Sequence, residues 1–234
     1  MKDAAKLTEM VDLVVADQHD QKYSENSGTV NFKFGHILSK VLFKVKLKNA
    51  LSGNTRVFVK KLEILGSTNN GTSKFYTKAK YKNQHWQYDA ANIPATDFDV
   101  ANIMNVAAVS GVGDYTKTAI EATTSAASLF KDGEFLFLIP VNDSETAGAE
   151  TGTTSNGEIK VRLTYDAITP DVNDPTNKYL VSETEALVDL PSGALKLGTA
   201  YIYTFNLALN PVQVTVDNTI TDWTNGTSGN TGDI

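Results

Sequence analysis

The stretch VLFKVKLK, residues 41–48, alternates apolar side chains with mostly cationic ones. Successive side chains of a β-strand point to opposite faces of its sheet, so a period of two predicts a half-buried strand. A slip of one residue would bury the lysines, and the register of such a strand is therefore strongly specified. We expect burial of Val41, Phe43, Val45 and Leu47, and exposure of Lys44 and Lys46.

The same alternation recurs along the chain. Residues 159–165 (IKVRLTY) alternate strictly, residues 201–209 place a tyrosine, phenylalanine or leucine at every second position, and residues 212–217 place a valine at every second position. Residues 134–140 (EFLFLIP) are apolar on both faces, which is typical of a strand buried between two layers. Segments rich in Gly, Asn and Asp separate these runs, so the pattern favours an all-β sandwich or barrel. Helical periodicity is confined to residues 4–15 and 97–109.

Composition indicates an ordinary soluble protein and excludes several kinds of chemistry. The chain has 234 residues, of which 41% are hydrophobic and 21% charged, with a net charge of -6. That charge disfavours nucleic acid as a partner, because the phosphate backbone attracts basic proteins. The absence of cysteine excludes disulfides, thiolate catalysis and cysteine-ligated metals. No run of apolar residues is long enough for a transmembrane helix, so the chain is either cytoplasmic or exported by a signal that has been removed.

Candidate catalytic and metal-binding residues are few. His36 ends an apolar run with no nucleophile spaced to serve it, and no G-x-S-x-G motif is present, so we expect His36 to be structural. Oxygen ligands of the kind that calcium takes cluster in a segment that lacks the glycine and glutamate of an EF-hand, and we expect a turn there. That cluster is Asp166, Asp171, Asn173 and Asp174. The sequence therefore predicts no enzyme activity, no cofactor and no metal.

Aromatic residues gather in the segment FYTKAKYKNQHWQYD, residues 75–89. Their rings offer stacking faces to a sugar, but alternation along strands sends about half of such rings into a core. Ligand stacking would require at least two exposed, coplanar rings, and burial in the core is the favoured interpretation. The rings concerned are Tyr76, Tyr81, Trp86 and Tyr88.

Two segments together resemble a known family. Residues 31–45 (NFKFGHILSKVLFKV) contain F-x-H-x-L-S-K-V, and residues 195–226 contain a glycine, Y-x-Y, an alternating strand, a short turn, a second strand and I-x-D-W. This order of motifs is similar to that of the fimbrillin-like proteins of Bacteroidales, the subunits and tip components of type V pili. The resemblance covers about residues 30–226.

The resemblance implies a transthyretin-like antiparallel β-sandwich with long loops and little helix. It implies that residues 1–28 are a segment or linker from a missing or truncated first domain, that residues 29–226 form the β-sandwich domain, and that residues 227–234 are a disordered polar tail. It also implies a structural or adhesive role at the cell surface, in a fimbrium or at the outer membrane. The implied partners are other fimbrial subunits or ligands on host or bacterial surfaces, with a possible lipid anchor upstream of this chain.

Members of the family that polymerise exchange a β-strand between subunits, and this sequence has one segment suited to that role. Residues 212–223 carry alternating apolar side chains that a groove can accept, whereas the tail after them is almost wholly polar. We expect any donated strand to come from this segment and to lie against its own domain in the monomer. The residues concerned are Val212, Val214, Val216, Ile220 and Trp223. The alternative function is a carbohydrate-binding module of the cell surface.

Overall fold

The computed structural model consists almost entirely of β-strands. Within the residues that it describes, the only helix is a single 3-10 turn, η2 (Ala90–Asn92). None of the described residues belongs to a helix that is long and apolar enough to cross a membrane. The structure describes residues 11–16, 32, 34–82, 85–100, 120–130, 134–141, 159–174, 179–190, 195–209 and 212–223.

The first sheet has the order β10-β3-β13-β14, with β9 also paired to β3. Its strands are β3 (Ser39–Leu47), β9 (Ala127–Ser128), β10 (Leu136–Leu138), β13 (Thr199–Leu209) and β14 (Val212–Asp222). Among the strands that the structure describes, β3 and β13 form the one parallel pair, and the others are antiparallel as expected. A parallel pair needs a long connection, and here most of the domain lies between the two strands.

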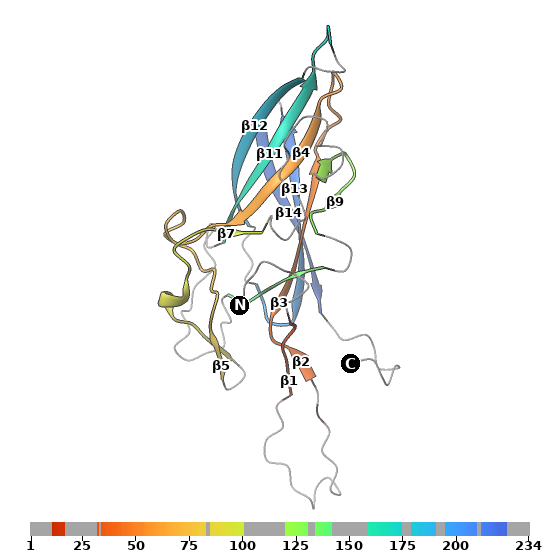
Figure 1. Cartoon of the computed structure of the whole chain (residues 1–234). Coiled ribbons are helices and arrows are strands. Elements are labelled where there is room, and N and C mark those ends of the chain that lie inside the picture. The colour runs from red at the N-terminus through yellow and green to blue at the C-terminus, as the bar shows by residue number, and fades with distance from the viewer. Residues whose placement is uncertain are drawn as a thin grey trace, which may run out of the picture.

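The second sheet has the order β12-β11-β4-β7, with β8 also paired to β4. It contains β4 (Arg56–Ile64), β7 (Phe98–Asp99), β8 (Ile120–Ala122), β11 (Lys160–Pro170) and β12 (Tyr179–Asp189). In Figure 1, β12, β11 and β4 cross in front of β13 and β14, so the two sheets form the layers of a sandwich. The all-β sandwich expected from the sequence is therefore confirmed, while its transthyretin-like detail stays a prediction.

Two short ribbons complete the fold. β1 (Val14–Ala16) pairs with β2 (Phe34–His36), and β5 (Lys80–Lys82) pairs with β6 (His85–Gln87). The β1-β2 ribbon extends from the lower end of the sandwich in Figure 1. The helices predicted from periodicity are wrong where they can be checked, because residues 14–15 lie in β1 and residues 98–99 form β7. The rest of the two predicted helices lies outside the described residues, at residues 4–10 and 101–109. The predicted disordered tail, residues 227–234, lies outside them as well.

The core lies between the inner faces of the two sheets. Val41, Phe43 and Val45 are fully buried and Leu47 is 8% exposed, which confirms the predicted apolar face of β3. Lys44 and Lys46 are half-buried, so the prediction that they are exposed is wrong. Since β3 is an interior strand flanked by β13 on one side and by β9 and β10 on the other, neighbouring side chains cover the lysine stems.

Phe43 is the ring around which the first sheet packs. Its ring stacks on Tyr203 and Phe205, each at 5.8 Å between centroids, and meets Phe130 edge-on at 6.0 Å. We expect Phe43→Ala to lower the free energy of unfolding by about 3–5 kcal/mol in urea titrations, because it leaves a cavity among these rings. Phe34→Ala is the control, since Phe34 is 57% exposed, and should change stability by no more than about 0.5 kcal/mol. Equal losses in the two variants would contradict this assignment of the core.

Candidate assembly strand and its anchor

β14 is an edge strand with a neighbour on one side only among the described strands. All eleven of its residues pair with β13, from Val212 opposite Leu209 to Asp222 opposite Thr199. At its end the Trp223 N–H donates to the Gly198 carbonyl at 2.9 Å. Antiparallel ladders alternate, so the backbone groups of Val214 and every second residue to Asp222 point away from β13. This edge can accept another strand.

The side chains of β14 divide between the core and the solvent. Val214 and Val216 are partly buried and pack against the core, whereas Ile220 is 51% exposed. The opposite face of the strand presents exposed threonines and Asp217. The side chain of Val212 lies outside the described residues. The expectation that residues 212–223 lie against their own domain is confirmed, and their role in assembly stays a prediction.

Trp223 anchors the end of β14 on the outer face of the first sheet. Its indole stacks on the His36 ring at 3.8 Å with 8° between the planes, and on Phe137 at 5.5 Å with 12°. The Lys40 ammonium lies 5.2 Å from the Trp223 ring and 3.7 Å from the Phe135 ring. Burial lowers the pKa of Lys40, and the nearby charge of Asp12 works in the opposite direction. Strands β2, β3 and β10 thus all contribute to the support under Trp223.

His36 links this anchor to the N-terminal ribbon. Its Nδ1 lies 2.6 Å from Oδ2 of Asp12, and the Ile37 N–H donates to the Leu13 carbonyl at 3.0 Å. The side chain of His36 is 10% exposed. The ring is therefore packed and hydrogen-bonded, as the structural interpretation predicted. The Asp12 contact could not be anticipated, because twenty-four positions separate the two residues.

Gly198 lies where the F-x-H segment around His36 meets the I-x-D-W segment that ends at Trp223. It adopts a φ of 61°, a left-handed conformation that favours glycine, and a Cβ there would lie 3.1 Å from the His36 carbonyl oxygen. Its N–H donates to the Leu38 carbonyl at 3.1 Å, while its own carbonyl accepts from Trp223. The F-x-H segment, the glycine and the I-x-D-W segment therefore form one contiguous anchor.

The predicted stacking aromatics occupy a different place and are largely buried. Tyr76 is 7% exposed and Trp86 is 4% exposed, and the Trp86 Nε1–H donates to the Ile37 carbonyl at 2.7 Å. Tyr81 meets Trp86 at 65°, and Tyr88 meets Tyr76 at 35°. The Tyr88 hydroxyl donates to the Pro140 carbonyl at 2.6 Å. These four rings do not provide the exposed, coplanar pair that sugar stacking would require.

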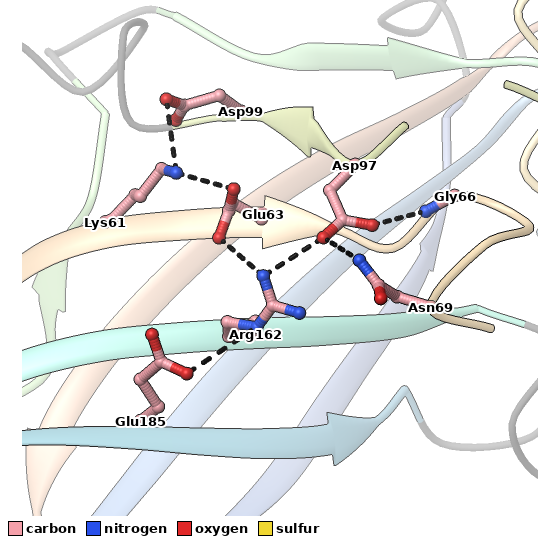
Figure 2. Close-up of polar contacts among 8 residues, drawn as sticks. All are labelled: Lys61, Glu63, Gly66, Asn69, Asp97, Asp99, Arg162 and Glu185. Atoms are coloured by element: carbon pink, nitrogen blue, oxygen red, sulfur yellow. Dashed lines mark hydrogen bonds and ion pairs between the residues drawn. The ribbon is translucent and has the colours of Figure 1, made fainter. Parts of the chain in front are cut away.

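The second sheet carries a polar network that sequence reasoning missed (Figure 2). Arg162 Nη1 donates to Glu63 Oε2 at 3.1 Å and to Asp97 Oδ2 at 3.0 Å, and Asp97 also accepts from the Gly66 N–H at 3.0 Å. Burial opposes the charge of Arg162, but hydrogen bonds and charges from Glu63 and Asp97 outweigh it and raise its pKa. The network ties β4, β11 and the segment before β7 together. The sequence contains one indication of this network. Arg162 is one of the two arginines of the chain, and it lies in a predicted strand. The remaining members are Lys61, Asn69, Asp99 and Glu185.

The acidic segment considered for calcium is divided between a strand and a turn. Asp166 lies in β11, is 1% exposed and has Lys60 Nζ at 3.4 Å from its Oδ2. Asp171 accepts from the N–H of Asn173 at 2.7 Å, which is the expected Asx turn. Within the part of the chain that the structure describes, no three acidic or histidine side chains gather as a metal site would require.

Comparison with known proteins identifies the family of this chain and agrees with its fold. Residues 2–223 match the fimbrillin-like family. This chain belongs to that family. The fimbrillin-like chain is 33% identical over 227 residues to the fimbrium subunit Fim1C of Phocaeicola vulgatus, an alignment that covers 92% of this chain and 56% of that protein. It also superposes on the crystal structure of a fimbrial protein from Bacteroides vulgatus with a TM-score of 0.70 and 31% identity, over 88% of this chain and 60% of the other.

These relatives confirm the resemblance read from the two sequence segments. The fimbrillin-like chain spans less than two thirds of the length of either relative. Since the family and both relatives are structural proteins of fimbriae, the prediction that this chain is not an enzyme is confirmed. The predicted boundaries at residues 28 and 226 stay predictions.

Trp223→Ala should increase local opening at the end of β14 and should lower the stability of the whole domain only modestly. We expect a loss of about 1–2 kcal/mol in unfolding free energy, because one stacked ring is removed. Hydrogen exchange should accelerate at Thr219 and Thr221, whose N–H groups face β13, with little change in β11. Leu187→Ala on β12, where the side chain is 61% exposed, is the control and should leave those amides unaffected. Unchanged exchange at Thr219 and Thr221 in Trp223→Ala would show that Trp223 is no anchor.

Arg162→Met should destabilise the protein by about 1–3 kcal/mol, because Glu63 and Asp97 each lose a charge-assisted hydrogen bond at a largely desolvated site. Arg56→Met is the matched control. Arg56 is paired with Glu121 at 2.8 Å but is exposed, and an exposed ion pair contributes about 0–1 kcal/mol. Urea titration of both variants measures the difference. If Arg56→Met proves as destabilising as Arg162→Met, the network in Figure 2 has no special structural role.

Proposed function

We propose that this protein is a structural component of fimbriae at the cell surface, and that its subunits associate by exchange of strand β14. Family membership supports the fimbrial role. The observation that carries the strand assignment is the position of β14 as an eleven-residue edge strand whose Val214 and Val216 pack against the core. The partners would be other fimbrial subunits.

Strand exchange suits β14 because its contacts can be rebuilt in a neighbour. Removal of β14 would open a groove along β13 beside Phe205 and Leu207, which lie opposite Val216 and Val214. A strand with the same alternation then restores both the ladder and the apolar contacts. Exchange of an identical element between subunits has little net energetic cost. The anchor at Trp223 would set how readily β14 leaves its own domain.

The other long edge strand, β12, is less suited to pairing with a neighbour. Its exposed apolar residues Leu180 and Leu187, at 71% and 61%, are interspersed with the exposed carboxylates of Glu183, Glu185 and Asp189. Charged residues on an edge discourage strand addition. The exposed face of β14 consists mostly of threonine, a residue favoured in strands.

The alternative of carbohydrate binding through Tyr76, Tyr81, Trp86 and Tyr88 has no support from the geometry, since two of these rings are buried. An adhesive role through another surface is compatible with the fimbrial proposal. Attachment through a lipid upstream of this chain stays a prediction.

A disulfide between β13 and β14 tests the proposal. Ile202 and Thr219 are register partners on the outer face of the first sheet. As a hydrogen-bonded pair, their Cα atoms are about 5.5 Å apart, within the range of a disulfide. The chain has no other cysteine. The oxidised Ile202→Cys/Thr219→Cys variant should stay monomeric, and reduction should restore polymerisation, followed by light scattering and electron microscopy.

The matched control locks the other edge strand. Ala167→Cys with Ser182→Cys joins β11 to β12 at a pair of register partners. This variant should polymerise as the unmodified protein does, whether oxidised or reduced. Polymerisation of the oxidised Ile202→Cys/Thr219→Cys variant at the unmodified rate would contradict the exchange of β14. Because both variants carry one added disulfide, their comparison separates the position of the lock from its general effect on stability.

A further inference from the structure

A polar groove of about 380 Å³ lies on the outer face of the first sheet, near the end opposite the Trp223 anchor. Lys46 and Lys48 line it from β3 and the residue after it, and Thr215 and Asp217 line it from β14. Thr124 comes from the segment between β8 and β9. Backbone bonds fix this end of β3, because the Leu47 N–H donates to the Thr123 carbonyl at 2.6 Å and the Lys48 N–H donates to the Leu207 carbonyl at 2.8 Å.

The lysines of this groove are not in contact with a carboxylate of the described part of the chain, although Asp217 lines the same groove. Neither Lys46 nor Lys48 forms an ion pair there, in contrast to Lys60 and Lys61 on the second sheet, each of which contacts two carboxylates. Lys46 and Lys48 both line the groove, and an anionic ligand would offset the repulsion between their charges. With Asp217 as the one carboxylate among the lining residues, the groove has a net positive charge in a protein whose net charge is -6.

The floor of the groove offers hydrogen-bonding atoms that suit hydroxyl groups. Asn206 is 7% exposed, and its Nδ2 donates to Asp217 Oδ2 at 2.9 Å. That bond fixes the orientation of both side chains. The Oδ1 of Asn206 and the Oδ1 of Asp217 accept no hydrogen bond from the described residues, so both are available to a ligand. The hydroxyls of Thr124 and Thr215 both donate and accept.

We propose that this groove binds an acidic sugar, a saccharide unit that carries a carboxylate or a sulfate group. Lys46 and Lys48 would contact the anionic group, while Asn206, Asp217 and Thr215 would contact ring hydroxyls. The volume falls in the range of small-ligand sites, about 300–1,000 Å³. Carboxylate and sulfate have the same charged-oxygen chemistry toward lysine. In the monomer every contact is made within one chain, and after exchange of β14 the wall formed by Thr215 and Asp217 would come from the neighbouring subunit.

The test is titration of the isolated monomer with three sugars, followed by amide and side-chain NMR shifts. Digalacturonic acid represents the carboxylate source, a disulfated heparin disaccharide represents the sulfate source, and lactose is the neutral comparison. We expect one of the acidic sugars to bind with millimolar or better affinity, to shift the Asn206 side-chain amide, and to bind more weakly as salt rises. Lactose should not shift that amide.

Two double variants of equal charge change localise the binding. Lys46→Gln/Lys48→Gln should weaken binding by about tenfold or more, since charge-assisted hydrogen bonds are lost. Lys78→Gln/Lys80→Gln removes two exposed lysines near β5, away from the groove, and should leave the affinity unchanged. Thr215→Val, which retains both lysines, should weaken binding several-fold.

Three outcomes would overturn the proposal. They are an absence of shifts at Asn206 with both acidic sugars, equal binding of lactose, and equal losses in the two lysine variants. Unfolding curves of each variant show whether a loss of binding reflects a loss of fold, in which case Thr215→Val decides. Failure of strand exchange leaves this result untouched, since binding is measured on the monomer.

Discussion

The structure depends on β13, which is paired along both edges. It runs parallel to β3 and antiparallel to β14, and its inward side chains Tyr201, Tyr203, Phe205 and Leu207 are at most 1% exposed. Two ladders and a row of four buried side chains fix this strand in the middle of its sheet. β14 has only one ladder and a partly buried face, so it is the long strand of this sheet that can leave with least loss. The geometry of β13 therefore makes β14 the natural strand for exchange.

The anchor shows how sequence motifs far apart in the chain act as one unit. His36, Gly198 and Trp223 touch, although each belongs to a different segment. Glycine is required where a Cβ would press on the His36 carbonyl, and tryptophan provides a ring large enough to cover both His36 and Phe137. The resemblance that identified the family thus rests on a physical contact. Asp12 extends that contact to the N-terminal ribbon.

Local patterns in the sequence predicted those features of the structure that depend on residues close together in the chain. Alternation identified the buried face of β3, and the lack of a partner for catalysis identified His36 as structural. Pairing between distant strands could not be predicted, because nothing local encodes it. The parallel register of β3 with β13, the half-burial of Lys44 and the network around Arg162 all arise from such pairing. The groove beside Lys46 could not be predicted for the same reason, since the residues that line it come from four separate segments.

Mixed assembly of two single-cysteine variants tests most directly whether β14 is exchanged between subunits. Ile202 lies on β13, and Thr219 is its register partner on β14. If β14 of one subunit pairs with β13 of the next, oxidised fimbriae grown from equal amounts of Ile202→Cys and Thr219→Cys should contain disulfide-linked dimers with one subunit of each variant. Oxidised fimbriae that contain no such mixed dimer would contradict the account, because they would show that each β14 remains on its own domain.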